Sequence, residues 1–506
     1  MTWTGVVVQA AYFGTLSVLA AYGLHRLSLV WIFLRHRREQ PTPDALGPDA
    51  PRPAVTVQLP IYNEYYVVER LIDAACSLRY PAGRLEIQVL DDSTDGTSAL
   101  AAGLVASYRD RGHDIHHIRR SERAGFKAGA LAGGLATARG DLIAIFDADF
   151  VPPPDFLERT VWRFTSRPRL GMVQARWGHI NRDWSLLTRA QALLLDGHFV
   201  VEHEARQAAG RFLNFNGTAG ILRRECIEQA GGWQHDTLTE DLDLSYRAQL
   251  AGWRFEYLGG LQVPAELPVE INALRSQQRR WSKGSIQTAL KLAGPVLRSP
   301  LPRAVKLEAL AHLTNNAAYL LLALLAVLIV PALAMRPNHP GAFLLADLPL
   351  FLAGTGSFAL FCAVAQRETR RDWWRSVMML PAMMALGIGL CLNNSVAVVE
   401  ALRGQASDFH RTPKYRIAPA EGGSGVRWLA LAYQGPRSWL VVAETAFAVW
   451  FAAAIVVAVG QGRYASLPFL LLFEGGFLFV SVFSLAQDVS RRFTLWSGRP
   501  AEAPAP

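Results

Sequence analysis

The sequence predicts a mostly parallel α/β domain inserted between α-helical membrane segments. Apolar runs long enough to cross a bilayer occur near both ends of the 506-residue chain, but none occurs between residues 39 and 300. In that middle part, short runs rich in β-branched residues alternate with helical segments. This alternation is typical of βαβ crossovers and a parallel sheet. A mean hydropathy of +0.15 over so long a chain also indicates membrane segments.

The composition excludes several classes of protein. A hydrophobic content of 51% excludes a generally disordered chain. The four cysteines lie far apart without any CxxC pair, which excludes a disulfide scaffold and a cysteine-based metal site. The net charge of +9 could favour nucleic acid. Because the basic residues concentrate at the borders of the apolar runs, we expect a membrane lipid environment and no nucleic-acid partner.

The N-terminal apolar run, Val6–Leu24, carries no charge and is followed by the basic cluster Arg35–Arg38. The positive-inside rule places that cluster in the cytoplasm and the N-terminus outside. A cleaved signal peptide is disfavoured because the charges follow the apolar run. Four more candidate spans form two hairpins: Ala317–Met335 with Ala342–Gln366, and Trp439–Gly460 with Ala465–Ala486.

The apolar segment Ser376–Ala401 has basic clusters on both sides. If it crossed the bilayer, one cluster would face outward, so we interpret it as an interfacial or re-entrant helix with Asn393 and Asn394 facing protein or water. Six spans are the alternative. The expected organisation is an N-terminal transmembrane helix (1–38), a cytoplasmic domain ending in an interfacial helix (39–300), and a C-terminal membrane domain (301–506). This makes the chain an integral protein of the inner (plasma) membrane.

Acidic residues follow the predicted strands of the middle domain. The strands are expected at Val55–Pro60, Leu85–Leu90, Leu142–Asp149 and Met172–Trp177. Ligands of parallel sheets bind beyond the carboxyl ends of the strands. The polar groups at those ends are Tyr62, Glu64, Asp91, Asp92, Asp147 and Asp149.

Asp147 and Asp149 are separated by one residue, so they point the same way from an extended backbone. Two such carboxylates can hold one hard divalent cation, Mg²⁺ or Mn²⁺, that keeps open positions for water and phosphate oxygens. An aspartate-rich turn after a strand is the alternative. The preceding apolar strand and the other acidic clusters favour the metal site.

Three further motifs place charged or polar side chains, which could bind substrate or take part in catalysis, on predicted helices. Lys127 stands at the mouth of a predicted helix, Ala128–Ala138, where a cation and free N–H groups suit an anion. Glu240 and Asp241 stand at a helix start, where a carboxylate in a cleft can act as a general base, although acidic first turns are common. The last motif has an amide, a guanidinium and an indole on one helix face, suited to phosphate and sugar: Gln277, Arg280 and Trp281.

Eight motifs occur in order: QLPIYNE, VLDDSTDGT, FKAGAL, IFDADF, VQARW, FNGTAG, TEDLDL and QQRRW. Together they resemble family 2 inverting glycosyltransferases of the processive, membrane-embedded kind, above all cellulose-synthase-like mannan and glucomannan synthases, and beyond them cellulose synthase. The resemblance covers Gln58–Trp281 and includes the D, D, D, QxxRW signature. It implies a nucleotide-sugar-binding, GT-A-like α/β fold.

The resemblance implies a role for each matching position. Asp241, with Glu240 beside it, would be the catalytic carboxylate that deprotonates the acceptor hydroxyl, and Asp147 and Asp149 would hold Mg²⁺ or Mn²⁺. The remaining positions would bind substrate: Tyr62, Glu64, Asp91, Asp92 and Lys127 the donor, and Phe215, Asn216, Gly217, Thr218, Gln277, Arg280 and Trp281 the acceptor and the leaving diphosphate.

The segment Phe409–Lys414 (FHRTPK) resembles the FxVTxK gating loop of cellulose synthases, with arginine where valine is usual. Phe409, Thr412 and Lys414 are its matching residues, and we place a gating-like loop at 403–437. The resemblance implies transfer from UDP-glucose or GDP-mannose to a growing β-linked polysaccharide that passes through the membrane. Transfer of one sugar to a lipid acceptor and a non-catalytic nucleotide-binding transporter or receptor are the alternatives. Nothing in the sequence points to particular accessory subunits.

Overall fold

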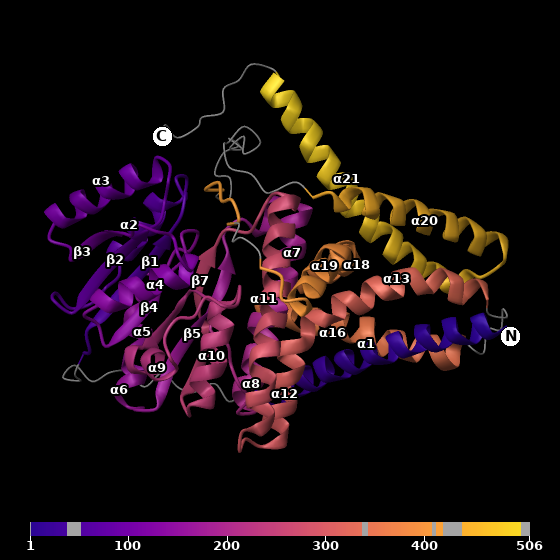
Figure 1. Cartoon of the computed structure of the whole chain (residues 1–506), viewed down its shortest axis with the longest axis horizontal. Helices are drawn as coiled ribbons and strands as arrows, with labels where there is room; N and C mark the ends of the chain where they lie inside the picture. Colours follow the sequence, from indigo (N-terminus) through magenta and orange to yellow (C-terminus); the bar gives the residue numbers. More distant parts are fainter. Residues whose placement is uncertain (1, 38–51, 336–342, 407–410, 418–437, 497–506) are drawn as a thin grey trace.

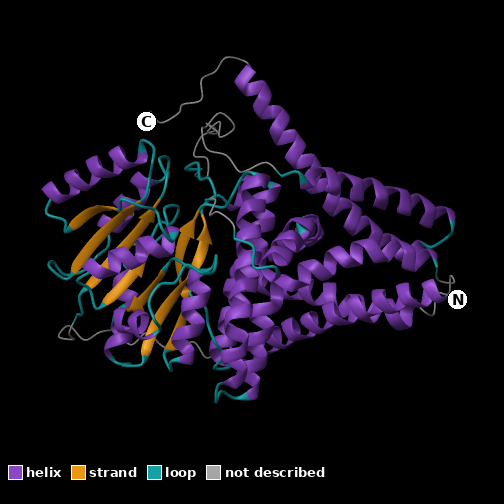
Figure 2. Cartoon of the chain, in the orientation of Figure 1, coloured by secondary structure: helices purple, strands orange, loops and turns teal. Residues whose placement is uncertain are grey.

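The computed structural model of the chain describes residues 2–37, 52–335, 343–406, 411–417 and 438–496. A sheet domain and a bundle of long helices lie side by side, with α7 and α11 between them (Figure 1). All strands belong to the sheet domain (Figure 2). The bundle contains the first helix of the chain and most of the chain after residue 300.

The sheet has seven strands in the order β3-β2-β1-β4-β6-β5-β7. All neighbouring pairs are parallel except those of β6, which is antiparallel to β4 and β5. The prediction of a mostly parallel sheet is therefore confirmed. The strands are β1 (Val55–Ile61), β2 (Leu85–Asp91), β3 (Ile115–Arg119), β4 (Leu142–Ile145), β5 (Leu170–His179), β6 (Gly220–Arg223) and β7 (Arg254–Ala265).

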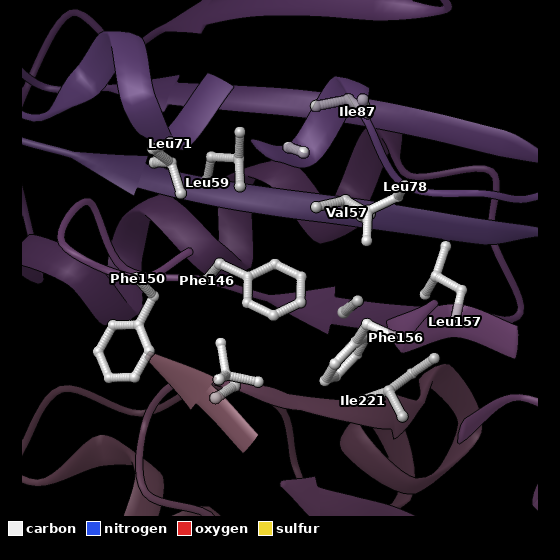
Figure 3. Close-up of a cluster of buried hydrophobic side chains, with 14 of the residues drawn as sticks. Val57, Leu59, Leu71, Leu78, Ile87, Phe146, Phe150, Phe156, Leu157 and Ile221 are labelled. Carbon is white, nitrogen blue, oxygen red and sulfur yellow. The ribbon is translucent and has the colours of Figure 1, made fainter. Parts of the chain in front are cut away.

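Helices cover both faces of the sheet, so β1 and β2 are buried almost without interruption, including their polar residues. One buried cluster includes Val57, Leu59, Phe146 and Ile221, whose side chains point toward one another in Figure 3. The second cluster packs the other face against α4, α9 and α10. The covering helices are α2 (Val68–Cys76), α3 (Thr97–Asp110), α4 (Phe126–Thr137), α5 (Phe156–Thr160), α6 (Trp162–Thr165), α9 (Arg224–Gln229) and α10 (Glu240–Leu250).

Two helical stretches join the sheet domain to the bundle. The first is α7 (Leu186–Asp196), a π-helix (Gly197–Glu202) and α8 (His203–Ala208) in direct succession. The second is α11 (Ile271–Arg298), which carries the QxxRW residues and continues well past Trp281. Its apolar positions continue beyond the QxxRW motif and pack against the bundle, so the helix does not end where the motif does.

Five helices in the described residues are long and apolar enough to cross a membrane, as predicted. They are α1 (Trp3–His36), the span Arg303–Ala334 with α12 (Arg303–Thr314) and α13 (Ala318–Ala334), the span Leu345–Thr369 with α15 (Leu348–Phe351) and α16 (Ser357–Thr369), α20 (Leu440–Gly460), and the span Tyr464–Val489 in α21 (Leu467–Trp496).

The segment predicted as interfacial or re-entrant is a broken helix. After α17 (Trp373–Val377), α18 (Leu380–Gly389) and α19 (Cys391–Leu402) meet at a bend of 41°. The asparagine pair of α19 faces protein, as predicted: both side chains are buried, and Asn393 Nδ2 donates to the Arg275 carbonyl at 3.0 Å. By length and composition the bent helix pair Trp373–Gly389 and Cys391–Leu402 also qualifies as a sixth span. The interfacial placement of this segment therefore stays a prediction.

The predicted extended backbone at the DxD motif is wrong. β4 ends at Ile145, and the Phe150 N–H donates to the Asp147 carbonyl at 3.0 Å, so Asp147–Asp149 lie on a turn. The three prolines at 152–154 follow this turn, and proline cannot donate to a strand ladder. The two aspartates reach the same cleft because the turn, and not a pleated strand, presents them.

Candidate functional site

A cleft of about 1290 Å³ opens beyond the carboxyl ends of β1 and β4 and extends to α11. It collects side chains from the sheet, from helix starts and from the segment 411–417. Nearly all residues that the sequence singled out line it: Tyr62, Glu64, Asp92, Lys127, Asp147, Asp149, Asn216, Gly217, Glu240, Asp241, Gln277, Arg280, Trp281, Thr412 and Lys414.

The two DxD carboxylates are each paired with a lysine. Lys127 Nζ lies 2.5 Å from Asp147 Oδ1, and Lys414 Nζ lies 2.6 Å from Asp149 Oδ2. Burial raises the pKa of Asp147, and the Lys127 ammonium opposes that rise. Burial also works to lower the pKa of Lys127, but the charges of Asp147 and Glu240 outweigh it and the pKa is raised. This part of the cleft therefore holds two carboxylates that already attract cations.

Asp241 and Glu240 lie in the first turn of α10. The Leu242 N–H donates to Asp241 Oδ1 at 2.8 Å. Burial, with a further contribution from the negative charge of Glu240, raises the pKa of Asp241 to about 7. A carboxylate with a pKa near neutrality suits proton abstraction from a hydroxyl.

Gly217 packs directly between Asp241 and Lys127. Its φ of +79° favours glycine. A Cβ there would lie 2.9 Å from Asp241 Oδ2 and 3.3 Å from Lys127 Nζ, and the Gly217 carbonyl accepts a hydrogen bond from Lys127 at 2.8 Å. Any other residue at this position would displace one of the two charged groups.

At the other end of the cleft, two arginines organise Tyr62 and Asp92. Arg120 donates to both carboxylate oxygens of Asp92, at 3.0 and 2.5 Å. The Arg123 guanidinium lies 3.4 Å from the centroid of the Tyr62 ring. Such a cation over an aromatic face makes a flat, positively charged platform. Neither arginine was among the predicted site residues, and RRSERAGF offers no motif beyond its charge.

Three predicted contact residues do not line the cleft, and the prediction of direct substrate contact is corrected for them. Asp91 is buried and accepts hydrogen bonds from His117 Nε2 at 2.8 Å and from the Ser93 N–H at 2.7 Å. Burial works to raise the pKa of Asp91, but these hydrogen bonds outweigh it and lower the pKa to about 2. Asp91 thus shapes the loop, and of the two alternatives only Asp92 faces the cleft.

Phe215 and Thr218 are the other two. Phe215 is 1% exposed and packs in the buried cluster against α4, α9 and α10. Thr218 is buried, and its Oγ1 accepts a hydrogen bond from the Asp147 N–H at 2.8 Å. Both residues support the cleft from behind. Phe409 lies outside the described residues.

Comparison with known proteins now decides the family. Residues 51–284 match the sequence model of a protein family described as "Glycosyltransferase like family 2". This part of the chain is a family 2 glycosyltransferase domain. The segment contains every acidic motif of the cleft and the QxxRW residues, so the family match and the geometry concern the same residues.

The glycosyltransferase domain is similar to curated plant proteins. Glucomannan 4-beta-mannosyltransferase 2 of Arabidopsis thaliana is 45% identical over 251 residues, which are 49% of this chain and 47% of that protein. Probable glucomannan 4-beta-mannosyltransferase 7 of Oryza sativa subsp. japonica is 47% identical over 249 residues, 48% of this chain and 43% of that protein. The chain thus matches somewhat less than half the length of these relatives.

A solved structure shares the fold. The mannosyltransferase PcManGT of Pyrobaculum calidifontis, in complex with GDP-Man and Mn²⁺, superposes with a TM-score of 0.54 at 22% identity. The likeness covers 77% of this chain and 99% of that protein. It confirms the predicted GT-A-like sheet flanked by apolar helices.

The segment 411–417 lies across the glycosyltransferase cleft. Glu266, which the sequence did not single out, accepts hydrogen bonds from the N–H groups of Tyr415 at 2.7 Å and Ile417 at 3.1 Å. Lys414 also donates to the Glu266 carbonyl. Arg411, which stands where the gating loop usually has valine, lies 3.1 Å from Glu64 Oε2. Burial raises the pKa of Glu64 to about 7, although Arg411 opposes that rise.

A second cavity of about 1510 Å³ lies in the helix bundle, among α1, α13, α16, α18 and α21. It adjoins the glycosyltransferase cleft: Leu195 and Trp281 line the cleft, while Leu194 and Asn316 line the cavity. Ser282, next to Trp281, donates to Asn316 Oδ1 at 3.4 Å. The lining is mostly apolar, although it includes the charged residues Arg26 and Asp347, and it is rich in aromatic rings: Tyr12, Tyr22, Tyr319, Phe351, Phe358, Phe469 and Phe473.

Proposed function

We propose that the protein is an inverting hexosyltransferase that moves sugar from a nucleotide-sugar donor to a growing β-linked polysaccharide and passes the product through the membrane. One observation carries the proposal: the acidic motifs and the QxxRW residues line a single cleft, and that cleft adjoins an aromatic-lined cavity among helices that can cross a membrane. The glycosyltransferase domain would face the cytoplasm, where nucleotide sugars are made.

The donor would lie with its nucleoside near Tyr62 and Asp92 and its diphosphate near Lys127. Arg120 holds Asp92 in place, and Arg123 covers one face of the Tyr62 ring. The named relatives are mannosyltransferases, and PcManGT was solved with GDP-Man. These likenesses favour GDP-mannose over UDP-glucose as the donor.

Asp147 and Asp149 would hold Mg²⁺ or Mn²⁺ together with the diphosphate. The site fits such an ion because two carboxylates supply hard oxygen ligands and each now pairs with a lysine. In the described residues no group of three or more His, Cys, Asp or Glu is arranged to hold a metal, so phosphate oxygens and water would complete the coordination. A bound divalent cation would neutralise charge on the leaving diphosphate.

Asp241 would take the proton from the acceptor hydroxyl as its oxygen bonds to the anomeric carbon and the bond to the diphosphate breaks. An inverting transfer needs this base opposite the leaving group. Arg280 and Trp281, on the same face of α11, would pair with the diphosphate and stack on the acceptor sugar. Lys414 would exchange its contact with Asp149 for one with the diphosphate.

The membrane cavity would receive the product. Sugar rings stack on aromatic side chains, and the cavity begins one residue away from residues of the cleft. Transfer of one sugar to a lipid acceptor remains the second candidate, since the same lining also contains Leu322, Leu325 and Leu333, which suit an acyl or prenyl chain. The length of the product separates the two functions.

The test incubates the purified full-length protein with GDP-mannose, UDP-glucose and other sugar nucleotides, with Mg²⁺ or Mn²⁺, and digests the product with linkage-specific hydrolases. We expect a polymer from one donor that a β-specific hydrolase degrades. Organic-soluble material of one or two sugars would exclude the polysaccharide and support the lipid acceptor.

The Asp241→Asn variant is the matched control for this assay. It keeps the shape of the cleft and the Leu242 hydrogen bond but removes the base. We expect donor binding within about threefold of wild type and a loss of turnover on the order of 10²–10⁴-fold, the typical contribution of a general base. Normal turnover would remove Asp241 from this role.

A further inference from the structure

The helical stretch behind the cleft contains an irregularity with chemical consequences. Between α7 and α8 the backbone forms the π-helix Gly197–Glu202, and the His203 N–H donates to the His198 carbonyl. Such π-turns are rare and occur often at functional sites. The wide turn brings His198, Glu202 and His203 together behind Asn216, which lines the cleft.

Both histidines bond the side-chain amide of Asn216. Asn216 Nδ2 lies 3.0 Å from His198 Nε2, and Asn216 Oδ1 lies 3.0 Å from His203 Nε2. His198 Nδ1 donates to Glu202 Oε2 at 2.8 Å, so its Nε2 is free to accept from the amide. His203 Nε2 then donates to Asn216 Oδ1, and His198 Nε2, which also lies 3.1 Å from His203 Nε2, is the acceptor of this arrangement.

The surroundings of His203 agree with that assignment. Its ring is fully buried and stacks on Tyr257, with ring centroids 4.7 Å apart. Its Nδ1 is buried without a hydrogen-bond partner, which suits an unprotonated nitrogen better than an N–H group. Burial also lowers the pKa of His203 well below its usual range. The ring is therefore a fixed, neutral donor to Asn216.

The pair is anchored on its far side to membrane helices. Arg206 bonds Glu202 and lies 3.0 Å from Glu308 Oε1 of α12. Glu308 also bonds His25 of α1 at 2.7 Å. The π-helix thus has little freedom to move away from the cleft.

Asn216 links the anchored histidines to the loop that contacts Asp241 and Lys127. Its amide is used by the histidines and its N–H donates to Gln174 Oε1 at 3.0 Å, so its side chain holds the loop and does not reach for the acceptor. The next residue, Gly217, touches both Asp241 and Lys127. A tilt of this loop would displace the base and the lysine together.

We propose that His198 and His203 are positioning residues for sugar transfer, which act through Asn216 on the loop that sets Lys127 and Asp241. The inference rests on the proposed function. It predicts a larger loss of turnover than of donor affinity, because the nucleoside end of the cleft lies on β1 and β2, away from the pair, and only the Lys127 contact of the donor would be disturbed.

The test uses the full-length protein and the variants Asn216→Ala, His203→Ala and their double mutant. We expect each single variant to lower turnover on the order of 10–100-fold, the effect of misplacing reacting groups by about 1 Å. The calorimetric Kd for GDP-mannose with Mn²⁺ should rise by a smaller factor than turnover falls, because the nucleoside contacts at Tyr62 and Asp92 are untouched. Because His203 acts through Asn216, the double mutant should be no worse than the poorer single variant.

Two further variants separate positioning from a general structural effect. His203→Gln retains an N–H donor for Asn216 and should recover most of the turnover lost in His203→Ala. His116→Ala, on the edge strand β3 and paired only with Asp114, should leave turnover unchanged. Melting temperatures show whether each variant is folded. The side chain of Asn216 is only half-buried, so Asn216→Ala still tests the prediction if His203→Ala, at a fully buried position, unfolds.

Wild-type turnover in Asn216→Ala overturns the inference, as do independent, multiplying defects in the double mutant or a His203→Gln variant no better than His203→Ala. If wild type itself forms no glycan from any donor, the proposed function fails instead. The two failures are therefore distinguishable.

Discussion

Asp241 lies in the first turn of α10 beside Glu240, in a cleft lined by five further acidic residues, of which the sequence singled out four: Glu64, Asp92, Asp147 and Asp149. The sequence predicted these acids and their convergence, because each follows a strand or opens a helix at the same edge of the sheet. It could not predict their partners. Lys414 is 265 positions from Asp149 and Arg411 is 347 from Glu64, and only the fold brings such distant charges together.

The raised pKa of Asp241 leads to a prediction for the pH dependence of transfer. In its proposed role as base, Asp241 must be ionised, and its pKa of about 7 means that the protonated form dominates at lower pH. We expect kcat/KM to fall as the pH drops through neutrality. Glu240→Gln removes a negative charge that raises the pKa of Asp241, so the acidic limb should move to lower pH.

A pH series of initial rates for wild type and Glu240→Gln checks this expectation. Glu225→Gln, an exposed acid on α9, should leave the limb in place. A limb that moves to higher pH, or stays unchanged in Glu240→Gln, would mean that another group sets the profile.

At the scale of elements, apolar strands and helix starts were predictable, whereas short and polar strands were not. β1 (VTVQLPI) and β2 (LEIQVLD) have apolar residues at alternating positions and match their predicted ranges closely. The predictions omitted β3, β6 and β7: β3 (IHHIR) is short and polar, the four residues of β6 are too short to show a period, and β7 (RFEYLGGLQVPA) contains two glycines and a proline. Asp91 was ambiguous because burial of one aspartate in a DD pair depends on His117 of β3, which packs beside β2.

The segment 411–417 is held over the cleft chiefly by Glu266, and this predicts a local change in hydrogen exchange. Glu266→Gln replaces one accepting oxygen with an NH₂ group, so either Tyr415 or Ile417 loses its acceptor. Hydrogen bonds to charged groups contribute about 1.5–3 kcal/mol, so we expect amide exchange there to accelerate at least about tenfold.

Hydrogen–deuterium exchange with mass spectrometry on peptides covering this segment measures the change. Glu158→Gln, which disturbs an exposed pair with Arg79, is the control and should not alter it. Unchanged protection in Glu266→Gln would show that the ion pairs of Arg411 and Lys414 hold the segment without Glu266.

The close crossing of α18 and α21 predicts a difference between adjacent glycines. A Cβ on Gly476 would lie 2.6 Å from the Ala385 carbonyl oxygen, whereas a Cβ on Gly475 would meet nothing within 4 Å. Both changes to alanine have the same effect on helix propensity. The difference between the stabilities of the two variants therefore reports the packing at the crossing of α18 and α21. We expect Gly476→Ala to cost about 1–3 kcal/mol through overpacking and Gly475→Ala to cost none, measured as melting temperatures of the full-length protein in detergent. Equal melting temperatures would argue against this crossing.

At the scale of the whole molecule, the glycosyltransferase cleft and the membrane cavity both have lining residues on α7, Leu195 for the cleft and Leu194 for the cavity. Helix α11 carries the QxxRW residues and is fixed to the bundle by the buried Arg275–Glu444 pair and by Glu400, which bonds Arg279 and lies 3.3 Å from Lys283 Nζ. The sequence indicated that a catalytic domain lay between membrane segments, but periodicity carries no information on which helices enclose a cavity.

The cavity makes the last prediction testable on a single helix. Leu322 of α13 lines the cavity, whereas Leu324 of the same helix is 44% exposed on the outside of the bundle. A tryptophan at 322 would fill part of the path without touching the cleft, so Leu322→Trp should still form short oligosaccharides but deliver little polymer across the membrane. In proteoliposomes supplied with external donor, hydrolase-protected glycan inside the vesicles measures delivery. Leu324→Trp adds the same bulk toward lipid and should export normally. Equal export by both variants would place the polymer's path elsewhere, while loss of short products in Leu322→Trp would show that the cavity and the cleft cannot be separated.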